Sequence, residues 1–464
     1  MNEAIARHKT LGKTDMVLFT VSAILLLDTL AAAASIGPSS VFWWLFLGVV
    51  FFVPFAMICA EMGCTYPEQG GIYAWVRSAF GGRWGSRVSW GYWVNTAVWI
   101  PAIFILFAGI LKQLFLPDLS LQGQIAVGIF LIWVAVALNV VTLDIGKWIP
   151  NLGAIFKIVV FVAVIAGALL YTQEHGMANV ISLETLAPNW NSSAQYIPTI
   201  IYGMLGFELV SASSEEMIDP ANDVPRSIFI SGFIIIVLYT AATAAVLAAL
   251  PADGIDLVEG LMDTLNLFFG NGSSGQIFVL ILGVAALYTF FSNGVTWALG
   301  CNRAAAEAAQ EGELPAFFGI ESKTRGTPIG ATVVMGIFGT LTLLLYGVLS
   351  ESNEDLFWSL FAFSAVIFLL PYIGMLLAFI KSRNFDVDRV RPYKVPGGNA
   401  VAKALAWVCI AVLALSIALF VYTPGEGLKF PVLIGAIVLI AIGEVLIRLA
   451  ETKKRALSKA AIAK

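Results

Sequence analysis

The chain has 464 residues, of which 59% are hydrophobic and 12% are charged, and its formal net charge is -4. Soluble domains carry about 25% charged residues, so this composition excludes a soluble protein and gives no sign of a nucleic-acid partner. Apolar runs long enough to cross a bilayer recur along the whole length. The sequence therefore predicts an all-α polytopic membrane protein.

Chemical motifs are scarce. The four cysteines form no CxxC pair, and the two histidines are isolated in the sequence, so we expect no metal and no disulfide framework. HExxH, GxxxxGK and GxSxG patterns are absent. We therefore expect neither an enzyme nor a cofactor.

The apolar runs predict twelve membrane spans, with both termini in the cytoplasm. In this orientation all but three of the 26 lysines and arginines lie on the cytoplasmic side, and the exceptions are Lys112, Lys157 and Lys429. This asymmetry is typical of plasma or bacterial inner membrane proteins. The predicted spans are 15–37, 41–64, 86–116, 121–143, 151–172, 195–217, 226–250, 274–301, 328–349, 355–381, 401–423 and 430–449.

The segments outside the spans differ in charge. Residues 251–273 contain four acidic residues and no basic one, and they predict a solvated outer loop that includes a short amphipathic helix. A role in attracting cations is the alternative. Residues 1–14 form the cytoplasmic N-terminus, and the basic tail 450–464 is expected at the anionic inner leaflet.

Three ionisable residues stand out within the predicted spans. Asp28 lies in the first, Lys157 in the fifth and Glu208 in the sixth. An ionisable side chain within a membrane is costly and marks a functional site by default. Two structural alternatives remain: Asp28 and Lys157 pair with each other, or Glu208 makes a contact at a helix end. Gly203 and Gly206 near Glu208 indicate an unwound segment that lines a cavity.

Three stretches carry a resemblance to a known family. They are AEMGCTYPEQGGIYAWVRSAFGGRWG (60–85), GFELVSASSEEMIDPANDVPRS (206–227) and CNRAAAEAAQEGELP (301–315). They resemble the amino acid–polyamine–organocation superfamily over nearly the whole chain. The similarity is greatest to its glutamate/γ-aminobutyrate antiporter group and extends to arginine/agmatine antiporters.

The resemblance implies the fold of sodium-coupled leucine transporters. That fold has two inverted repeats of five helices, here 15–172 and 195–381, followed by two further helices in 401–449. The first and sixth helices are broken, and the substrate lies at the midplane between them. Its carboxylate would meet backbone amides of the first break, and its amine would meet carbonyls of the second.

Site residues follow from the same resemblance. The first break is expected at residues 22–26, where many members have a Gly-rich run but this chain has Ile-Leu-Leu. For Tyr202 and Trp297, ordinary packing is the alternative. Lys157 resembles a lysine that replaces a sodium ion in proton-dependent members. The substrate-binding candidates are Ser22, Ala23, Ile24, Leu25, Leu26, Asp28, Asn95, Thr96, Tyr202, Gly203, Leu205, Trp297 and Ser364, and the proton-coupling candidates are Lys157, Glu208 and Asp28.

Asp28 has three competing roles. It binds a cationic group of the substrate, takes up a proton, or is a static partner of a helix dipole or of Lys157. A pair of acids, Asp28 and Glu208, near one cavity would favour a zwitterionic or cationic substrate over glutamate.

The sequence thus predicts a secondary transporter of amino acids or related amines, working by proton symport or by exchange. Its expected partners are this substrate, protons and the lipid bilayer. A non-transporting sensor or scaffold that keeps the fold is the main alternative. An intramembrane enzyme would need a nucleophile–base pair or a metal set in the spans, and a channel would need a continuous polar face.

Overall fold

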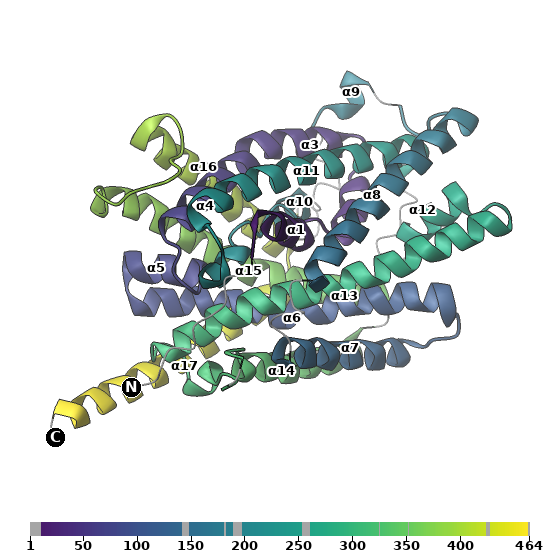
Figure 1. The fold of residues 1–464 in the computed structure, drawn as a ribbon. Helices are drawn as coiled ribbons and strands as arrows, with labels where there is room; N and C mark the ends of the chain where they lie inside the picture. Colours follow the sequence, from purple (N-terminus) through teal and green to yellow (C-terminus); the bar gives the residue numbers. More distant parts are fainter. Residues whose placement is uncertain are drawn as a thin grey trace.

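A computed structural model describes residues 11–141, 148–180, 182–188, 197–252, 260–323, 325–350, 352–423 and 427–462. Helices form nearly all of it (Figure 1). The first half contains α1 (Lys13–Ile24), α2 (Leu27–Ala34), α3 (Ser39–Leu47), the π-helix η1 (Gly48–Phe52), α4 (Val53–Thr65), α5 (Ile72–Phe80), α6 (Gly82–Phe115), α7 (Leu121–Val141), α8 (Trp148–His175) and α9 (Leu183–Leu186). The second half contains α10 (Ile197–Tyr202), the 3-10 helices η3 (Leu209–Glu216) and η5 (Ala316–Gly319), α11 (Pro220–Ala249), α12 (Gly260–Phe269), α13 (Gly272–Gln310), α14 (Ile329–Leu349), α15 (Asn353–Phe385), α16 (Gly398–Val421), β1 (Tyr422–Thr423), β2 (Gly427–Leu428) and α17 (Phe430–Ile462).

Within these described residues, ten helices are long and apolar enough to cross a membrane. The bent pair α1 and α2 raises the number to eleven if it forms one span. The predicted span 195–217 is not one continuous helix, because α10 ends at Tyr202 and η3 begins only at Leu209. A polytopic helical protein is therefore observed, and the number twelve stays a prediction.

A two-stranded hairpin is a small addition to the predicted helical architecture. β1 and β2 pair antiparallel between α16 and α17. These strands have two residues each, and their pairing satisfies backbone groups where the chain reverses direction. Of the predicted acidic loop, residues 253–259 lie outside the described part of the chain, and α12 supplies a short helix in the remainder.

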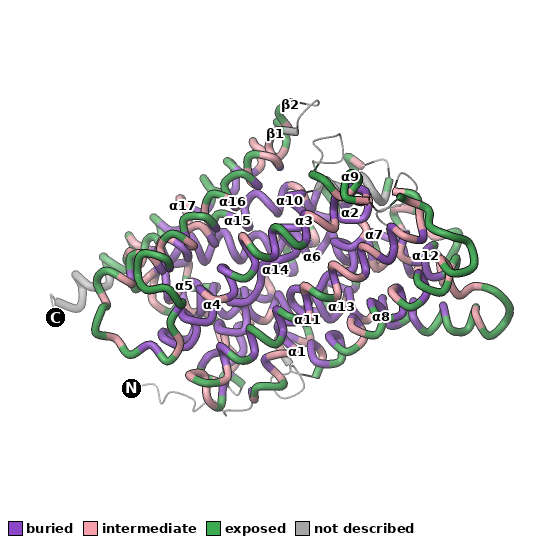
Figure 2. The backbone as a smooth tube through the Cα atoms, turned by 90° about the horizontal axis from the view of Figure 1, so that it is seen from above, coloured by how far each residue is buried: buried purple, intermediate pink, exposed green. Residues whose placement is uncertain are grey.

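The long helices pack in two kinds of environment. α6 and α15 lie largely in the interior, and α6 contacts both α15 and α13, whose second half is buried. Figure 2 shows buried residues through the middle of the bundle and exposed residues along α16 and α17. In its most apolar stretch α6 is 89% buried, against 28% for α17, so α6 is central and α17 faces outward.

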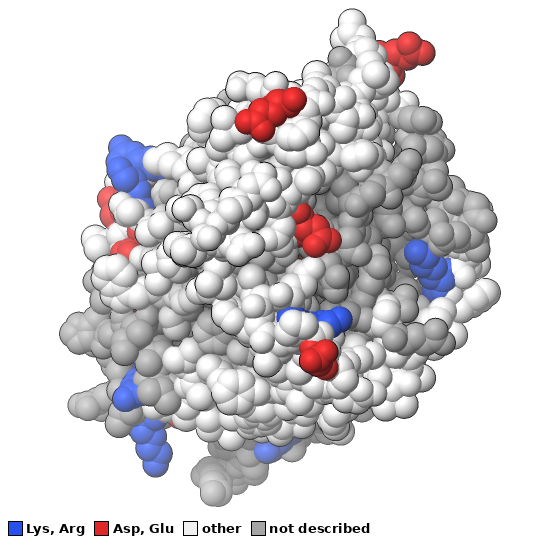
Figure 3. Space-filling view, turned by 90° about the vertical axis from the view of Figure 1, so that its right-hand side faces the viewer, with Lys and Arg blue, Asp and Glu red and all other residues white. Residues whose placement is uncertain are grey.

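The start of α1 and the ends of α13 and α17 lie at one end of the bundle. Leu11 pairs with Met217, Glu216 pairs with Arg303 of α13, and Lys454 of α17 donates to the carbonyl of Glu311 after α13. This end is the predicted cytoplasmic side. On the face shown in Figure 3, charged side chains are sparse among the described residues.

Candidate functional site

The first predicted span is broken at Leu25 and Leu26. Both residues have extended backbone angles, and the helices on either side, α1 and α2, differ in direction by 45°. A break within a membrane protein leaves carbonyl and amide groups that must find partners elsewhere. The partners of these groups therefore define what the break can bind.

Side chains from three other helices meet the carbonyls at the end of α1. Lys157 of α8 donates to the Ser22 carbonyl at 2.5 Å. The Trp297 indole of α13 donates to the Ala23 carbonyl at 3.0 Å. Lys157 places its ammonium group at the negative end of this half-helix, where a cation is favoured.

Tyr239 of α11 bridges the break itself. Its hydroxyl donates to the Ile24 carbonyl at 2.8 Å and accepts from the Leu26 amide at 2.6 Å. Stacking on Trp44 at 4.3 Å holds the ring. The backbone amide nearest the break is therefore already used, which differs from the expectation that a substrate carboxylate would take it.

Asp28 lies in the first turn of α2 and is 8% exposed. Its carboxylate is close to the backbone N–H groups of Asp28 and Thr29. The positive end of a helix favours a negative charge at this place. Among the described residues Asp28 forms no ion pair within 4.0 Å, so its interaction with Lys157 is one at longer range. Lys157 is near enough to interact with Asp28 electrostatically, but it donates to Ser22.

The second break separates α10 from η3. Gly206 within it has a φ of 128°, a conformation that side chains rarely adopt. A Cβ atom at Gly206 would lie 3.0 Å from Ile24 and 3.2 Å from Trp297. Gly203 approaches Thr29 of α2 in the same way. The two glycines thus let the second break lie directly against the first.

A chain of aromatic contacts lies beside both breaks. The ring centroid of Phe368 in α15 is 4.9 Å from Tyr202, 5.2 Å from Trp297 and 4.8 Å from Tyr372. Trp297 also contacts Trp99 at 5.9 Å. All these rings are buried. Electron-rich aromatic faces attract organic cations, so the cluster can hold a cationic group.

Glu208 and Asp28 lie at opposite ends of this chain of aromatic rings. Glu208 precedes η3 and is 1% exposed. Tyr92 of α6 and Tyr372 of α15 each donate to its Oε1 at 2.7 Å. Its Oε2 has no hydrogen-bond partner among the described residues. Glu208 is thus a contact between three elements, with one carboxylate oxygen available to a further donor.

The remaining predicted residues fall into two groups. Tyr202 lies beside Asn95 and Ser364 and in electrostatic reach of Asp28, and both polar atoms of Asn95 lack partners within the described chain. Thr96 instead bonds to Cys301 at 2.7 Å, which ties α6 to α13. The backbone and hydroxyl contacts of Ser22, Ala23 and Ile24 hold α1, while Leu25, Leu26 and Leu205 are buried.

Our sequence predictions did not include Tyr239, which bridges the first break, or Tyr92 and Tyr372, which donate to Glu208. They also did not include Trp99 and Phe368 of the aromatic cluster. A signal was present for the tyrosines. Each lies within a long apolar run, where a buried phenol needs a hydrogen-bond partner. Nothing in the sequence identified which partner.

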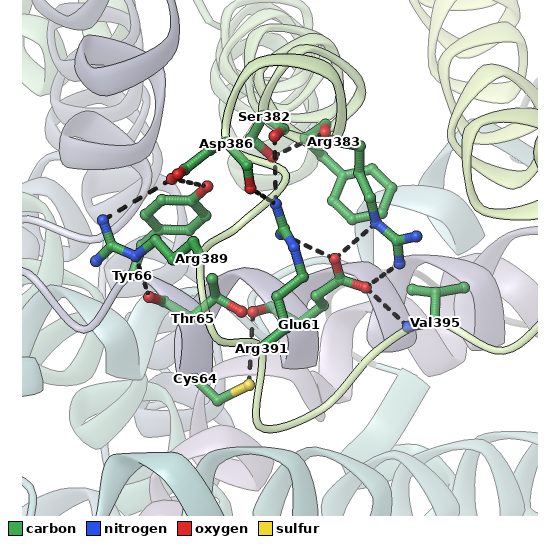
Figure 4. A network of polar contacts seen from close by, with 11 residues as sticks. Glu61, Cys64, Thr65, Tyr66, Ser382, Arg383, Asp386, Arg389, Arg391 and Val395 are labelled. Atoms are coloured by element: carbon green, nitrogen blue, oxygen red, sulfur yellow. Dashed lines mark hydrogen bonds and ion pairs between the residues drawn. The ribbon is translucent and has the colours of Figure 1, made fainter. Parts of the chain in front are cut away.

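A polar network closes the same end of the bundle that holds the start of α1. Figure 4 shows Arg383 and Arg391 pointing at the carboxylate of Glu61. The amide of Val395 also donates to Glu61 at 2.7 Å. Glu61 is fully buried in α4, and Arg383 lies in α15. The network joins α4, α15 and the loop that follows α15.

These features define a class of protein: a polytopic membrane protein whose broken helices meet at a buried site with acidic and aromatic side chains. The family model for amino acid permeases matches residues 11–442, so the chain belongs to this transporter family within the predicted superfamily. The prediction of a transporter rather than an enzyme is confirmed by the family and by the relatives below.

Three relatives match most of the chain. The probable agmatine/putrescine antiporter AguD of Lactococcus lactis is 32% identical over 441 residues, 93% of each protein. An uncharacterized transporter of Legionella pneumophila is 30% identical over 415 residues, 87% of this chain and 89% of the relative. The polyamine transporter PUT1 of Oryza sativa is 25% identical over 400 residues, 84% of this chain and 70% of the relative.

Proposed function

We propose that the protein is a secondary transporter of small organic amines that lack a carboxylate, and that it works by exchange. The substrate binds between the α1–α2 break and the α10–η3 break. Alternating access moves the broken helices against the surrounding bundle. The protein lies in the plasma or inner membrane with both termini in the cytoplasm.

The observation that carries this proposal is the position of Asp28. The N-terminus of α2 is where a carboxylate of an amino acid substrate would bind, because free N–H groups and the helix dipole favour an anion there. Asp28 supplies that anion from the protein itself, and Tyr239 occupies the Leu26 amide. A substrate carboxylate would meet like charge, whereas an amine would meet opposite charge.

The second acid extends the argument to substrates with two cationic groups. Asp28 and Glu208 lie at the two ends of the aromatic chain that runs through Tyr202, Phe368 and Tyr372. A diamine or an aminoguanidine can place one charge at each carboxylate and its apolar chain against the rings. The names of the Lactococcus and Oryza relatives, agmatine/putrescine antiporter and polyamine transporter, support this substrate class.

Charge compensation follows from the same residues. Lys157 holds the end of α1 through Ser22, and loss of its proton would release that end. Proton binding at Glu208 or Asp28 would replace a substrate cation there. We propose that these three residues couple exchange to pH, and no observation favours a sensor or scaffold over a carrier.

Counterflow in proteoliposomes tests the substrate class with pairs that differ only by a carboxylate. Agmatine is compared with arginine, and putrescine with ornithine. We expect each amine to stimulate uptake about tenfold more than its amino acid, a difference of about 1.4 kcal/mol. Asp28→Asn should reduce that preference, and Glu208→Gln should slow exchange of the dications most.

Asp118→Asn is the matched control, because Asp118 is an exposed acid outside the helices. Its preference should equal that of the unmodified protein. Equal stimulation by both members of each pair, or an unchanged preference in Asp28→Asn, would overturn the assignment of Asp28. No counterflow with any amine or amino acid would instead favour the sensor or scaffold.

A further inference from the structure

A groove of about 590 Å³ lies between α6, α15 and α17, outside the site described above. Its apolar walls include Trp90 of α6, Leu370 and Leu377 of α15, and Ile440 of α17. Gly91, Gly374 and Gly443 also line it, so three positions contribute no side chain to its filling. Its size is in the range of ligand-binding pockets.

The groove faces the bilayer side of the molecule. α17 packs at the periphery, and Ile437 and Ile440 on it are 56% and 44% exposed. Leu370 on the opposite wall is 38% exposed. In a membrane, hydrocarbon chains are the medium that contacts such a surface.

Charge is confined to one end of the groove. Among its lining residues within the described chain, only Arg87 and Glu444 are charged. Arg83 and Arg87 both bond to Glu444, and the Arg87 guanidinium lies 4.4 Å from the Trp84 ring centroid. Arg448 follows Glu444 by one helical turn, is exposed, and has no carboxylate partner among the described residues.

Arg87 and Glu444 line this end of the groove, Arg83 bonds to Glu444 beside it, and Arg448 lies one helical turn farther along α17. The excess of positive charge lies at the end where α6 begins, next to an exposed Trp84. Tryptophan favours the headgroup level of a bilayer, and basic pockets between membrane helices bind anionic lipid headgroups. We propose that the groove is a binding site for an anionic glycerophospholipid, with an acyl chain along α17 and its phosphate at Arg83, Arg87 and Arg448.

The site is connected to the substrate-binding elements. The floor of the groove is formed where Gly91 meets Pro371, because a Cβ at Gly91 would lie 3.1 Å from the proline ring. The next residues in each helix are Tyr92 and Tyr372, the two donors to Glu208. A lipid in the groove thus contacts α6 and α15 at the level where they hold Glu208, and it would influence transport through that contact.

Native mass spectrometry of the full chain tests binding directly, without reference to transport. The purified protein is mixed with equal amounts of phosphatidylglycerol and phosphatidylethanolamine that have identical acyl chains. We expect the protein to retain one lipid molecule, and to retain phosphatidylglycerol about tenfold more often than phosphatidylethanolamine. The double variant Arg83→Gln/Arg448→Gln should lose this preference, and Glu444→Gln should increase it, because it removes the competing carboxylate.

Control variants test whether the lipid binds in the groove or elsewhere on the surface. Ile440→Trp fills the groove and should abolish retention, whereas Ile437→Trp on the same helix lies outside the groove and should not. Arg455→Gln, farther along α17, should behave as the unmodified protein. Equal retention of both lipids, or retention in Ile440→Trp, would overturn the proposal. A dimer that Ile440→Trp disrupts, with no retained lipid, would assign the groove to a second copy of the chain.

The functional consequence is measured separately, as amine exchange in vesicles with and without phosphatidylglycerol. Exchange that depends on phosphatidylglycerol in the unmodified protein, but not in Ile440→Trp, would support the connection to Glu208. Because binding is measured by mass, a failure of the amine proposal leaves the lipid result interpretable.

Discussion

At the scale of single residues, Asp28 and Tyr239 account for a first helix that breaks without glycine. The residues at the break are Ile24, Leu25 and Leu26, and none of them is a glycine. The break persists because Tyr239 satisfies the Ile24 carbonyl and the Leu26 amide. Side-chain partners thus replace the conformational freedom that glycine would supply.

Tyr239→Phe tests this explanation. The variant keeps the ring on Trp44 but leaves two buried backbone groups without a partner, so we expect a loss of about 1–3 kcal/mol in the free energy of unfolding. Thermal unfolding in detergent measures it. Tyr288→Phe is the control, because the Tyr288 hydroxyl makes only a 3.4 Å contact. An equal loss in both variants would contradict a special role for Tyr239.

At the scale of secondary-structure elements, the sequence predicts most of the helices but not the contacts between them. The predicted and observed ends of α8 and α14 agree within a few residues, and so does the start of α17. Uninterrupted apolar runs determine where a helix lies in a membrane. The spans that contain Asp28 and Glu208 were expected to break, and both do. The pairing of Lys157 with Ser22 rather than Asp28 depends on helix rotation and packing, which composition does not encode.

The second break makes a prediction of its own. Gly206→Ala places a side chain at a φ of 128° and against Ile24 and Trp297. Backbone strain of this kind costs about 1–3 kcal/mol, so we expect loss of amine exchange together with reduced thermal stability. Gly176 also has a positive φ, of 81°, but no atom lies within 4 Å of the new Cβ in Gly176→Ala. Exchange should survive in Gly176→Ala, and its loss there would show that backbone strain alone explains the effect.

The short helix α5 supplies a test that includes pH. Tyr73 donates to Glu313 at 2.7 Å, and burial together with the Glu313 carboxylate raises the pKa of the phenol above its usual value. The phenol therefore stays protonated, and its contribution to stability is complete below the unfolded pKa of about 10 and declines only above it. Tyr73→Phe should lose about 1.5–3 kcal/mol, equally at pH 6 and pH 8.5. A loss that differs between these pH values, measured by thermal unfolding, would contradict this assignment.

At the scale of the whole molecule, buried ion pairs close one end of the bundle. Glu61 accepts from Arg383, Arg391 and the Val395 amide, and Glu216 pairs with Arg303 at 2.5 Å. These contacts connect helices far apart in sequence. They would have to rearrange for a substrate to leave at this end.

Glu61→Gln measures how strongly this end is closed. Removal of one partner leaves two buried guanidinium groups uncompensated, so we expect a loss of about 3–5 kcal/mol in stability. Glu68→Gln removes the carboxylate of the exposed pair with Arg389 and should cost at most about 1 kcal/mol. Thermal unfolding of the two variants measures both losses. Similar losses would contradict a stabilising role for the contacts of Glu61.

The length of α13 has a further consequence. Its 39 residues span about 58 Å at 1.5 Å per residue, nearly twice the hydrocarbon thickness of about 30 Å. One continuous rod thus carries Trp297 beside the first break and, after its last turn, Glu311 and Glu313, which contact Arg77 of α5. A tilt of α13 about Trp297 would displace both of its ends, including the one next to Glu311. If substrate binding tilts α13, as the proposed function requires of helices at the site, we expect a fluorescent reporter attached beside Glu311 to change its signal when the amine is added.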